Sequence, residues 1–254
     1  MENNHGYVKT ETHKGVTHIE FFHPQSNSLP LKLLNELAVA IHAAGIDPDT
    51  RVILLRSGGD RAFCGGASFH ELSAISNREE GTRFFSGFAQ VINAMRHCPR
   101  LIVGRIHGKC VGGGVGLAAA VDYAIAFEES EIKLSELSVG IGPFVVGPAI
   151  ERKIGLSAFT QLAIDAGMWR NSEWARRKGL FAEVHSSIEA MDESIDRLCN
   201  VLAHSSPEAM FELKKTSWSG TSDWDTLLEQ RAAISGKLIL TEHSRKAIAA
   251  FHKK

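Results

Sequence analysis

The sequence predicts an α/β fold, and three observations support that prediction. Residues 52–55 and 101–103 are continuous apolar runs, which are typical of strands buried on both faces. Residues 79–96 between them are consistent with a helix that ends before Cys98-Pro99. Buried strands that alternate with helices indicate an α/β protein. The length of 254 residues allows one large domain or two small ones with a real hydrophobic core.

The first part of the chain should form a hairpin and a helix. Residues 7–12 and 16–22 are two short strands joined by a turn at Lys14-Gly15. Pro30 is expected in the first turn of a helix. That helix would bury one apolar face, formed by Leu31, Leu34, Leu37 and Ile41.

The remaining elements change in character along the chain. Residues 57–67 form a glycine-rich loop, and a second glycine cluster at 112–114 precedes a small-residue helix. Strands are expected at 123–127 and 131–134, and the C-terminal part is helical, at 195–202, 207–215, 224–235 and 241–252. We therefore predict a core over residues 1–190 and a helical region over 191–254 that serves oligomerisation or covers a site.

Composition and charge exclude several classes of protein. Hydrophobic residues make up 44% and charged residues 22%, as in ordinary soluble proteins. Lys and Arg number 28 against 29 Asp and Glu, which argues against a nucleic-acid partner. The most apolar stretch, 111–127, contains Asp122 and is too short to span a membrane. Residues 1–12 have no apolar signal core, so we expect a cytoplasmic protein.

Cysteine and histidine spacing predicts no metal site. The four cysteines form no C-x-x-C pair, and the twelve histidines show no H-E-x-x-H motif. A reduced, intracellular setting fits four scattered cysteines.

The first loop is a candidate anion or oxyanion site. Gly65 and Gly66 allow a tight turn and a close backbone approach to a ligand. Ser68 can cap a helix that starts at Phe69, leaving backbone N–H groups free at its beginning. Glycine-rich loops between strands and helices are also common without any such role.

The second glycine cluster precedes a helix, whose N-terminus favours negative charge. Gly114-x-Gly116-x-x-Ala119 also satisfies a loose dinucleotide-binding pattern, with Glu136 about 20 residues further on. Small residues equally allow a helix to pack closely against a sheet.

Glu136 is the candidate catalytic carboxylate. Strand alternation places it on the same face as Ile132 and Leu134. A carboxyl on an apolar face should have a raised pKa, which suits a general base. The alternative is that the strand ends at Leu134 and that Glu136 lies in a solvated loop.

Four segments in order resemble the crotonase, or enoyl-CoA hydratase/isomerase, superfamily. A-F-C-G-G-A-S at 62–68 is similar to the family's A-F-x-x-G-A-D segment, and H-G-K-C-V-G-G-G at 107–114 to its N-G-x-x-x-G-G-G segment. Residues 134–141 and 172–180 are similar to its third motif and to its helix-glycine-leucine stretch. The resemblance runs from about Val16 to Val184.

The resemblance implies a spiral of ββα units, with C-terminal helices that build homotrimers or hexamers. It implies an acyl-CoA thioester as substrate, with coenzyme A as part of that substrate and no other cofactor. The N–H groups of Ala67 and Gly113 would hold the thioester oxygen. Further substrate contacts would come from Gly66, Ser68, Phe69, His70, Gly112, Gly114 and Phe144.

Departures from the family pattern indicate the reaction. Family hydratases carry two glutamates; Gly116 replaces one, and Glu136 matches the other. Family isomerases keep only the second, followed by an apolar loop like the one around Phe144. Ser68 and His70 replace an aspartate and a lysine that the family often carries.

The sequence therefore predicts an enzyme that isomerises the double bond of an enoyl-CoA, with Glu136 as the single base. A hydratase, for example of the methylglutaconyl-CoA type, is the nearest alternative. A nicotinamide-dependent oxidoreductase and a non-catalytic CoA-binding protein are the alternatives from other classes.

Overall fold

The computed structural model describes residues 6–251, in which six strands form the largest sheet. Its order is β1-β2-β4-β7-β9-β12, with β1 antiparallel to β2 and the other pairs parallel. The strands are β1 (Tyr7–His13), β2 (Val16–Phe22), β4 (Val52–Ser57), β7 (Leu101–Ile106), β9 (Tyr123–Phe127) and β12 (Glu183–His185).

Two smaller sheets lie at the end of the large one. One has the order β11-β10-β8-β5, and the other pairs β3 with β6. Their strands are β3 (Ser28–Leu29), β5 (Ala62–Cys64), β6 (Gly66–Ala67), β8 (Lys109–Val111), β10 (Glu131–Lys133) and β11 (Arg170–Asn171).

Each long parallel strand leads into a short strand and then into a helix. β4 continues into β5 and β6, β7 into β8, and β9 into β10. These successive ββα units make up the predicted crotonase-like spiral. Because β5, β8 and β10 are parallel neighbours, the segments that follow them meet at one edge, as ligand-binding loops do in α/β proteins.

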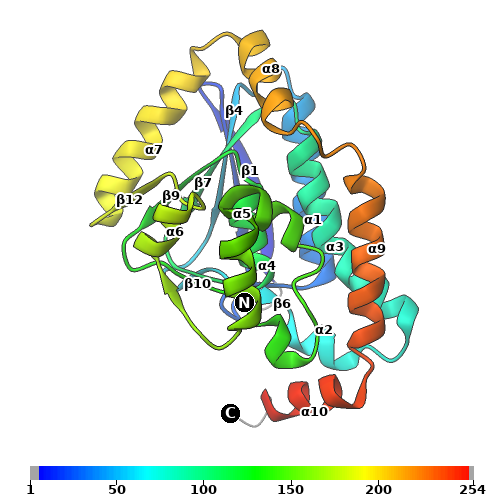
Figure 1. Ribbon diagram of the computed structural model, residues 1–254. Coiled ribbons are helices and arrows are strands. Elements are labelled where there is room, and N and C mark those ends of the chain that lie inside the picture. The colour runs from blue at the N-terminus through cyan, green and yellow to red at the C-terminus, as the bar shows by residue number, and fades with distance from the viewer. Residues whose placement is uncertain (1–5, 252–254) are drawn as a thin grey trace, which may run out of the picture.

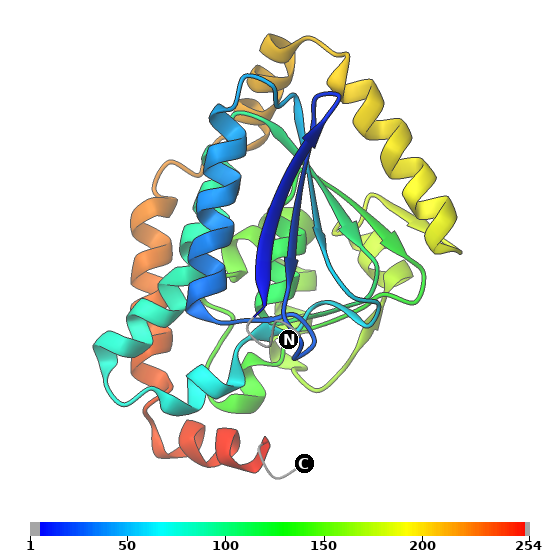
Figure 2. The same ribbon diagram turned by 180° about the vertical axis from the view of Figure 1, so that it is seen from behind.

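Helices cover both faces of the large sheet (Figures 1 and 2). α1 (Leu31–Ile46) packs on β1 and β2, and α3 (Arg78–His97) packs against α1. α7 (Ile188–Ala203) covers the opposite face, where Met191 and Ile195 pack into a cluster with Val103. The other helices near the short strands are α2 (Phe69–Ala74), α4 (Gly113–Ala120), η1 (Glu136–Val139), α5 (Gly147–Ile164) and α6 (Ser172–Lys178).

The C-terminal helices α8 (Pro207–Ser217), α9 (Trp224–Leu238) and α10 (Glu242–Phe251) pack on the same body. The buried Lys214 of α8 donates to Asp122 at 2.9 Å, and Trp218 donates to the same carboxylate at 3.0 Å. α9 runs along α3, and α10 lies against α2 and η1. The domain boundary predicted at residue 190 falls inside α7.

Two local predictions differ from the structure. Pro30 stands just before α1 as its N-cap rather than in the first turn. The strand expected over 131–134 ends at Lys133, so Glu136 lies on no strand face and instead begins η1. Gly140, with φ +75°, ends η1 by donating its N–H to the carbonyls of Glu136 and Leu137.

Residues 6–251 contain no helix that is both long and apolar enough to cross a membrane. The same residues contain no group of three or more His, Cys, Asp or Glu side chains placed to hold a metal ion.

Candidate active site

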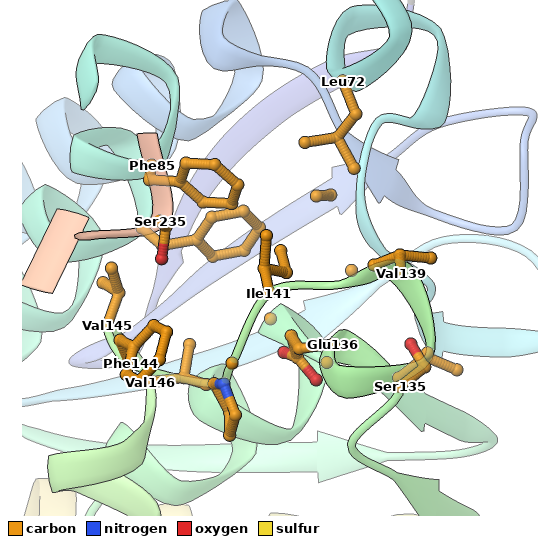
Figure 3. A pocket seen from close by; sticks show the side chains of 18 of the residues that line it. Leu72, Phe85, Ser135, Glu136, Val139, Ile141, Phe144, Val145, Val146 and Ser235 are labelled. Carbon is orange, nitrogen blue, oxygen red and sulfur yellow. The ribbon is translucent and has the colours of Figure 1, made fainter. Parts of the chain in front are cut away.

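A mostly apolar cavity opens where the segments after β5, β8 and β10 meet (Figure 3). Gly66 and Ala67 of β6, Gly112 and Gly113 at the start of α4, and Glu136 of η1 all line it. Its apolar walls come from Phe69, Leu72, Phe85, Phe88, Val111, Val139, Ile141, Pro143, Phe144, Val145 and Val146. The structure thus brings the three motif segments, which are far apart in sequence, into one site.

The Glu136 carboxylate is held in this apolar environment. The residue as a whole is half-buried, but its Oε2 atom is closed off from solvent and has no hydrogen-bond partner among the described residues. Burial raises the pKa of Glu136 from 4.5 to about 7. The strand-alternation argument was wrong about the backbone, because Glu136 begins η1. The alternative was right that the strand ends before Glu136 and wrong that this residue is solvated, since its carboxylate faces the cavity.

Gly112 allows the second motif to approach this carboxylate. Its φ is +51°, and its N–H donates to the carbonyl of Lys133 at 2.8 Å. A Cβ atom at Gly112 would lie 2.8 Å from Oε1 of Glu136. Glycine is therefore required here for both the backbone conformation and the contact.

Two backbone segments face each other next to Glu136. A Cβ atom at Gly66, whose φ is +86°, would lie 3.4 Å from the nitrogen of Gly113. Gly113 is the first residue of α4, so its N–H has no acceptor within the helix. The helix start also concentrates partial positive charge there. The neighbouring Ala67 segment lines the same cavity, so an oxyanion could be held between the two loops.

Gly114 and Gly116 serve close packing. A Cβ atom at Gly114 would lie 2.3 Å from the carbonyl oxygen of Cys64, which packs α4 tightly against the first loop. A Cβ atom at Gly116 would lie 2.5 Å from Cγ1 of Val146. Val146 lines the cavity, so it fills the space toward which a Gly116 side chain would point.

The predicted contacts from the first helix divide into two groups. Phe69 lines the cavity, as Phe144 does. Ser68 is buried as the N-cap of α2, and its Oγ accepts from the N–H of Glu71 at 3.4 Å. Among the described residues, Ser68, His70 and Gly114 lie outside the cavity lining, and His70 is exposed on α2.

Other reactive side chains nearby are unsuited to catalysis. His107 is buried, and burial lowers its pKa to about 4, so it stays neutral. Cys64 is completely buried, and burial raises its pKa to about 12.

Sequence reasoning missed the wall formed by α3 and α9. Phe85 and Phe88 come from α3, and Ser235 comes from α9. Figure 3 shows Phe85 and Ser235 next to each other. The spacing of the two phenylalanines on one helical face was a visible signal. No local pattern pointed to Ser235, because its position depends on the packing of α9 against α3, some 150 residues earlier in the sequence.

The spiral of ββα units and the carboxylate facing two backbone loops define a crotonase-type acyl-CoA enzyme. The family model for "Enoyl-CoA hydratase/isomerase" matches residues 11–254, and the chain belongs to that family. It is an enzyme of this family that acts on acyl-CoA thioesters, so the nicotinamide and non-catalytic alternatives are set aside.

Individual relatives include both isomerases and hydratases. The chain is 27% identical to the peroxisomal Delta(3,5)-Delta(2,4)-dienoyl-CoA isomerase of Arabidopsis thaliana, over 80% of this chain and 77% of that protein. It is 29% identical to the mitochondrial methylglutaconyl-CoA hydratase of Mus musculus, over 90% of this chain and 74% of that protein. A crystal structure of enoyl-CoA hydratase from Bacillus halodurans shares the fold, with a TM-score of 0.88 and 22% identity over 96% of this chain and 99% of that one.

Proposed function

We propose that the enzyme moves the double bond of a 3-enoyl-CoA into conjugation with the thioester, giving a 2-enoyl-CoA. The observation that carries this proposal is the number of carboxylates. Among the described residues that line the cavity, Glu136 is the only acidic one, and the position that matches the second hydratase glutamate is Gly116.

One carboxylate is enough for isomerisation. Glu136 takes a proton from C2 of the 3-enoyl-CoA, and the electron pair moves onto the thioester oxygen to give a dienolate. Glu136 then returns the proton to C4, and the double bond forms between C2 and C3. The reaction conserves protons and electrons, so it requires no redox cofactor.

The backbone stabilises the dienolate. The N–H groups of Ala67 and Gly113 are proposed to donate to its oxygen, and the positive end of α4 adds to their effect. Comparable donors contribute about 2.7–4 kcal/mol each to transition-state stabilisation. A pKa near 7 lets Glu136 both accept and return a proton at neutral pH.

Hydration of a 2-enoyl-CoA is the second candidate. The mouse relative named methylglutaconyl-CoA hydratase favours it. Ser135, which lines the cavity beside Glu136, would then have to supply the second polar contact to water. A panel of 2-enoyl- and 3-enoyl-CoA thioesters, with identification of each product, separates the two reactions.

We also propose that the protein forms a homotrimer or a dimer of trimers through its C-terminal region. Large apolar side chains of this region that are exposed in the single chain support association: Leu213 at 61%, Val201 at 52% and Phe211 at 44%. Light scattering after gel filtration should give a mass about three or six times the 27.7 kDa of one chain.

A further inference from the structure

An unpaired hydroxyl lies in the apolar part of the cavity. Ser235 is only 1% exposed and lines the cavity next to Phe85 (Figure 3). The hydroxyl has no hydrogen-bond partner among the described residues, and it is open to the cavity rather than sealed from it. A bound group that pairs with it in this apolar surrounding gains affinity.

The position of this hydroxyl is set by the backbone. A Cβ atom at Gly236 would lie 2.5 Å from the backbone nitrogen of Thr82, and one at Gly81 would lie 2.8 Å from Cα of Gly236. The two helices α3 and α9 therefore pack in close backbone contact directly beside Ser235. This contact holds Ser235 beside Phe85 in the cavity wall.

We propose that Ser235 is a specificity-determining residue that selects acyl groups bearing a neutral oxygen, a hydroxyl or a ketone, beyond the reacting carbons. This inference rests on the proposed function. In Figure 3, Ser235 lies across the cavity from Glu136, which acts at C2 and C4, so the oxygen belongs further along the acyl chain.

The lining indicates a neutral group. Among the described residues, no Lys, Arg or His side chain lines the cavity. A carboxylate at the far end of the acyl group would be buried there without a counter-charge, at a large desolvation cost. A hydroxyl or ketone needs only the one hydrogen bond that Ser235 can provide.

The test uses matched pairs of 3-enoyl-CoAs with six to nine backbone atoms in the acyl chain. In each pair a terminal hydroxyl replaces the terminal methyl. The kcat/KM ratio of each pair is measured for the wild type, for Ser235→Ala and for Ser222→Ala, an exposed serine outside the cavity. The same pairs, as saturated thioesters, are measured for binding by calorimetry.

At one chain length the wild type should prefer the hydroxylated member by about 5- to 10-fold, the usual effect of one hydrogen bond. Ser235→Ala should abolish that preference by lowering kcat/KM for the hydroxylated member alone, and Ser222→Ala should retain it. Binding should follow the same pattern.

Equal use of both members by the wild type at every length, or an unchanged preference in Ser235→Ala, would overturn the role of Ser235. A preference for carboxyl-terminated chains of the same lengths, measured beside these pairs, would overturn it as well. Failure of every 3-enoyl-CoA to isomerise would instead refute the proposed reaction, while the binding ratios would still decide on Ser235.

Discussion

Replacing Glu136 with glutamine should change stability and activity in ways that follow from one property of the carboxyl. Its pKa is raised from 4.5 to about 7 by burial. Below pH 4.5 this carboxyl is protonated in both the folded and the unfolded chain. Between pH 4.5 and 7 the unfolded chain loses this proton first, so the folded state becomes less stable as pH rises.

The size of this effect follows from the shift. A difference of one in pKa between the folded and unfolded chain corresponds to about 1.4 kcal/mol. Ionised Glu136 should therefore lower the free energy of unfolding by up to about 3 kcal/mol above pH 7. Glutamine is similar in shape and cannot ionise. Glu136→Gln should therefore match the wild type near pH 4.5 and exceed it in stability at pH 8.

Urea unfolding of both proteins at equal concentration, at pH 4.5, 6 and 8, measures this difference. Equal concentrations matter because association would contribute to stability. The same variant should lose about 10²–10⁴-fold in kcat, the usual contribution of a general base. A stability difference that does not change with pH would show that the carboxyl is not desolvated, and retention of more than a tenth of kcat would show that it is not the base.

Three further predictions concern the same site. The wild-type kcat/KM should rise about tenfold per pH unit at low pH and level off near pH 7, where Glu136 is ionised; a profile flat from pH 5 to 8 contradicts this. A Cβ atom at Gly113 would lie 2.2 Å from Phe88, so Gly113→Pro and Gly113→Ala are compared in a Phe88→Ala background. The proline variant lacks the N–H, and its kcat should be about 10²–10³-fold lower than that of the alanine variant. Equal losses would argue against the oxyanion role. The single variant Gly116→Glu should be destabilised by about 1–3 kcal/mol, because its side chain clashes with Val146. The double variant Gly116→Glu, Val146→Ala should regain stability and add water to a 2-enoyl-CoA. A folded double variant with no gain in hydration would show that residue 116 does not face the acyl chain.

The architecture was largely predictable from the sequence because buried strands and helices carry strong local signals. Residues 52–55 and 101–103 lie in β4 and β7, and Ser68 caps α2 as its residue type predicts. The two glycine-rich motifs also carry a local signal. Gly66 has a φ of +86° and Gly112 a φ of +51°, and few residues other than glycine adopt such values.

The environment of Glu136 was less predictable. The alternation of apolar residues in the sequence continues past the end of β10. Where β10 ends depends on its pairing with β8 and β11, which are distant in sequence. Two further features depend on how helices that are far apart in sequence pack together: Val146 fills the space beside Gly116, and Ser235 of α9 lines the cavity. Local patterns carry no information about such contacts.

The most direct test of the central claim is product analysis with a 3-enoyl-CoA and the matching 2-enoyl-CoA, followed by NMR. With Glu136 as the only acidic group in the described cavity lining, the 3-enoyl-CoA should be converted to the 2-enoyl-CoA, and the 3-hydroxyacyl-CoA should form far more slowly. A wild-type enzyme that adds water to the 2-enoyl-CoA as fast as it moves the double bond would contradict the single-carboxylate mechanism.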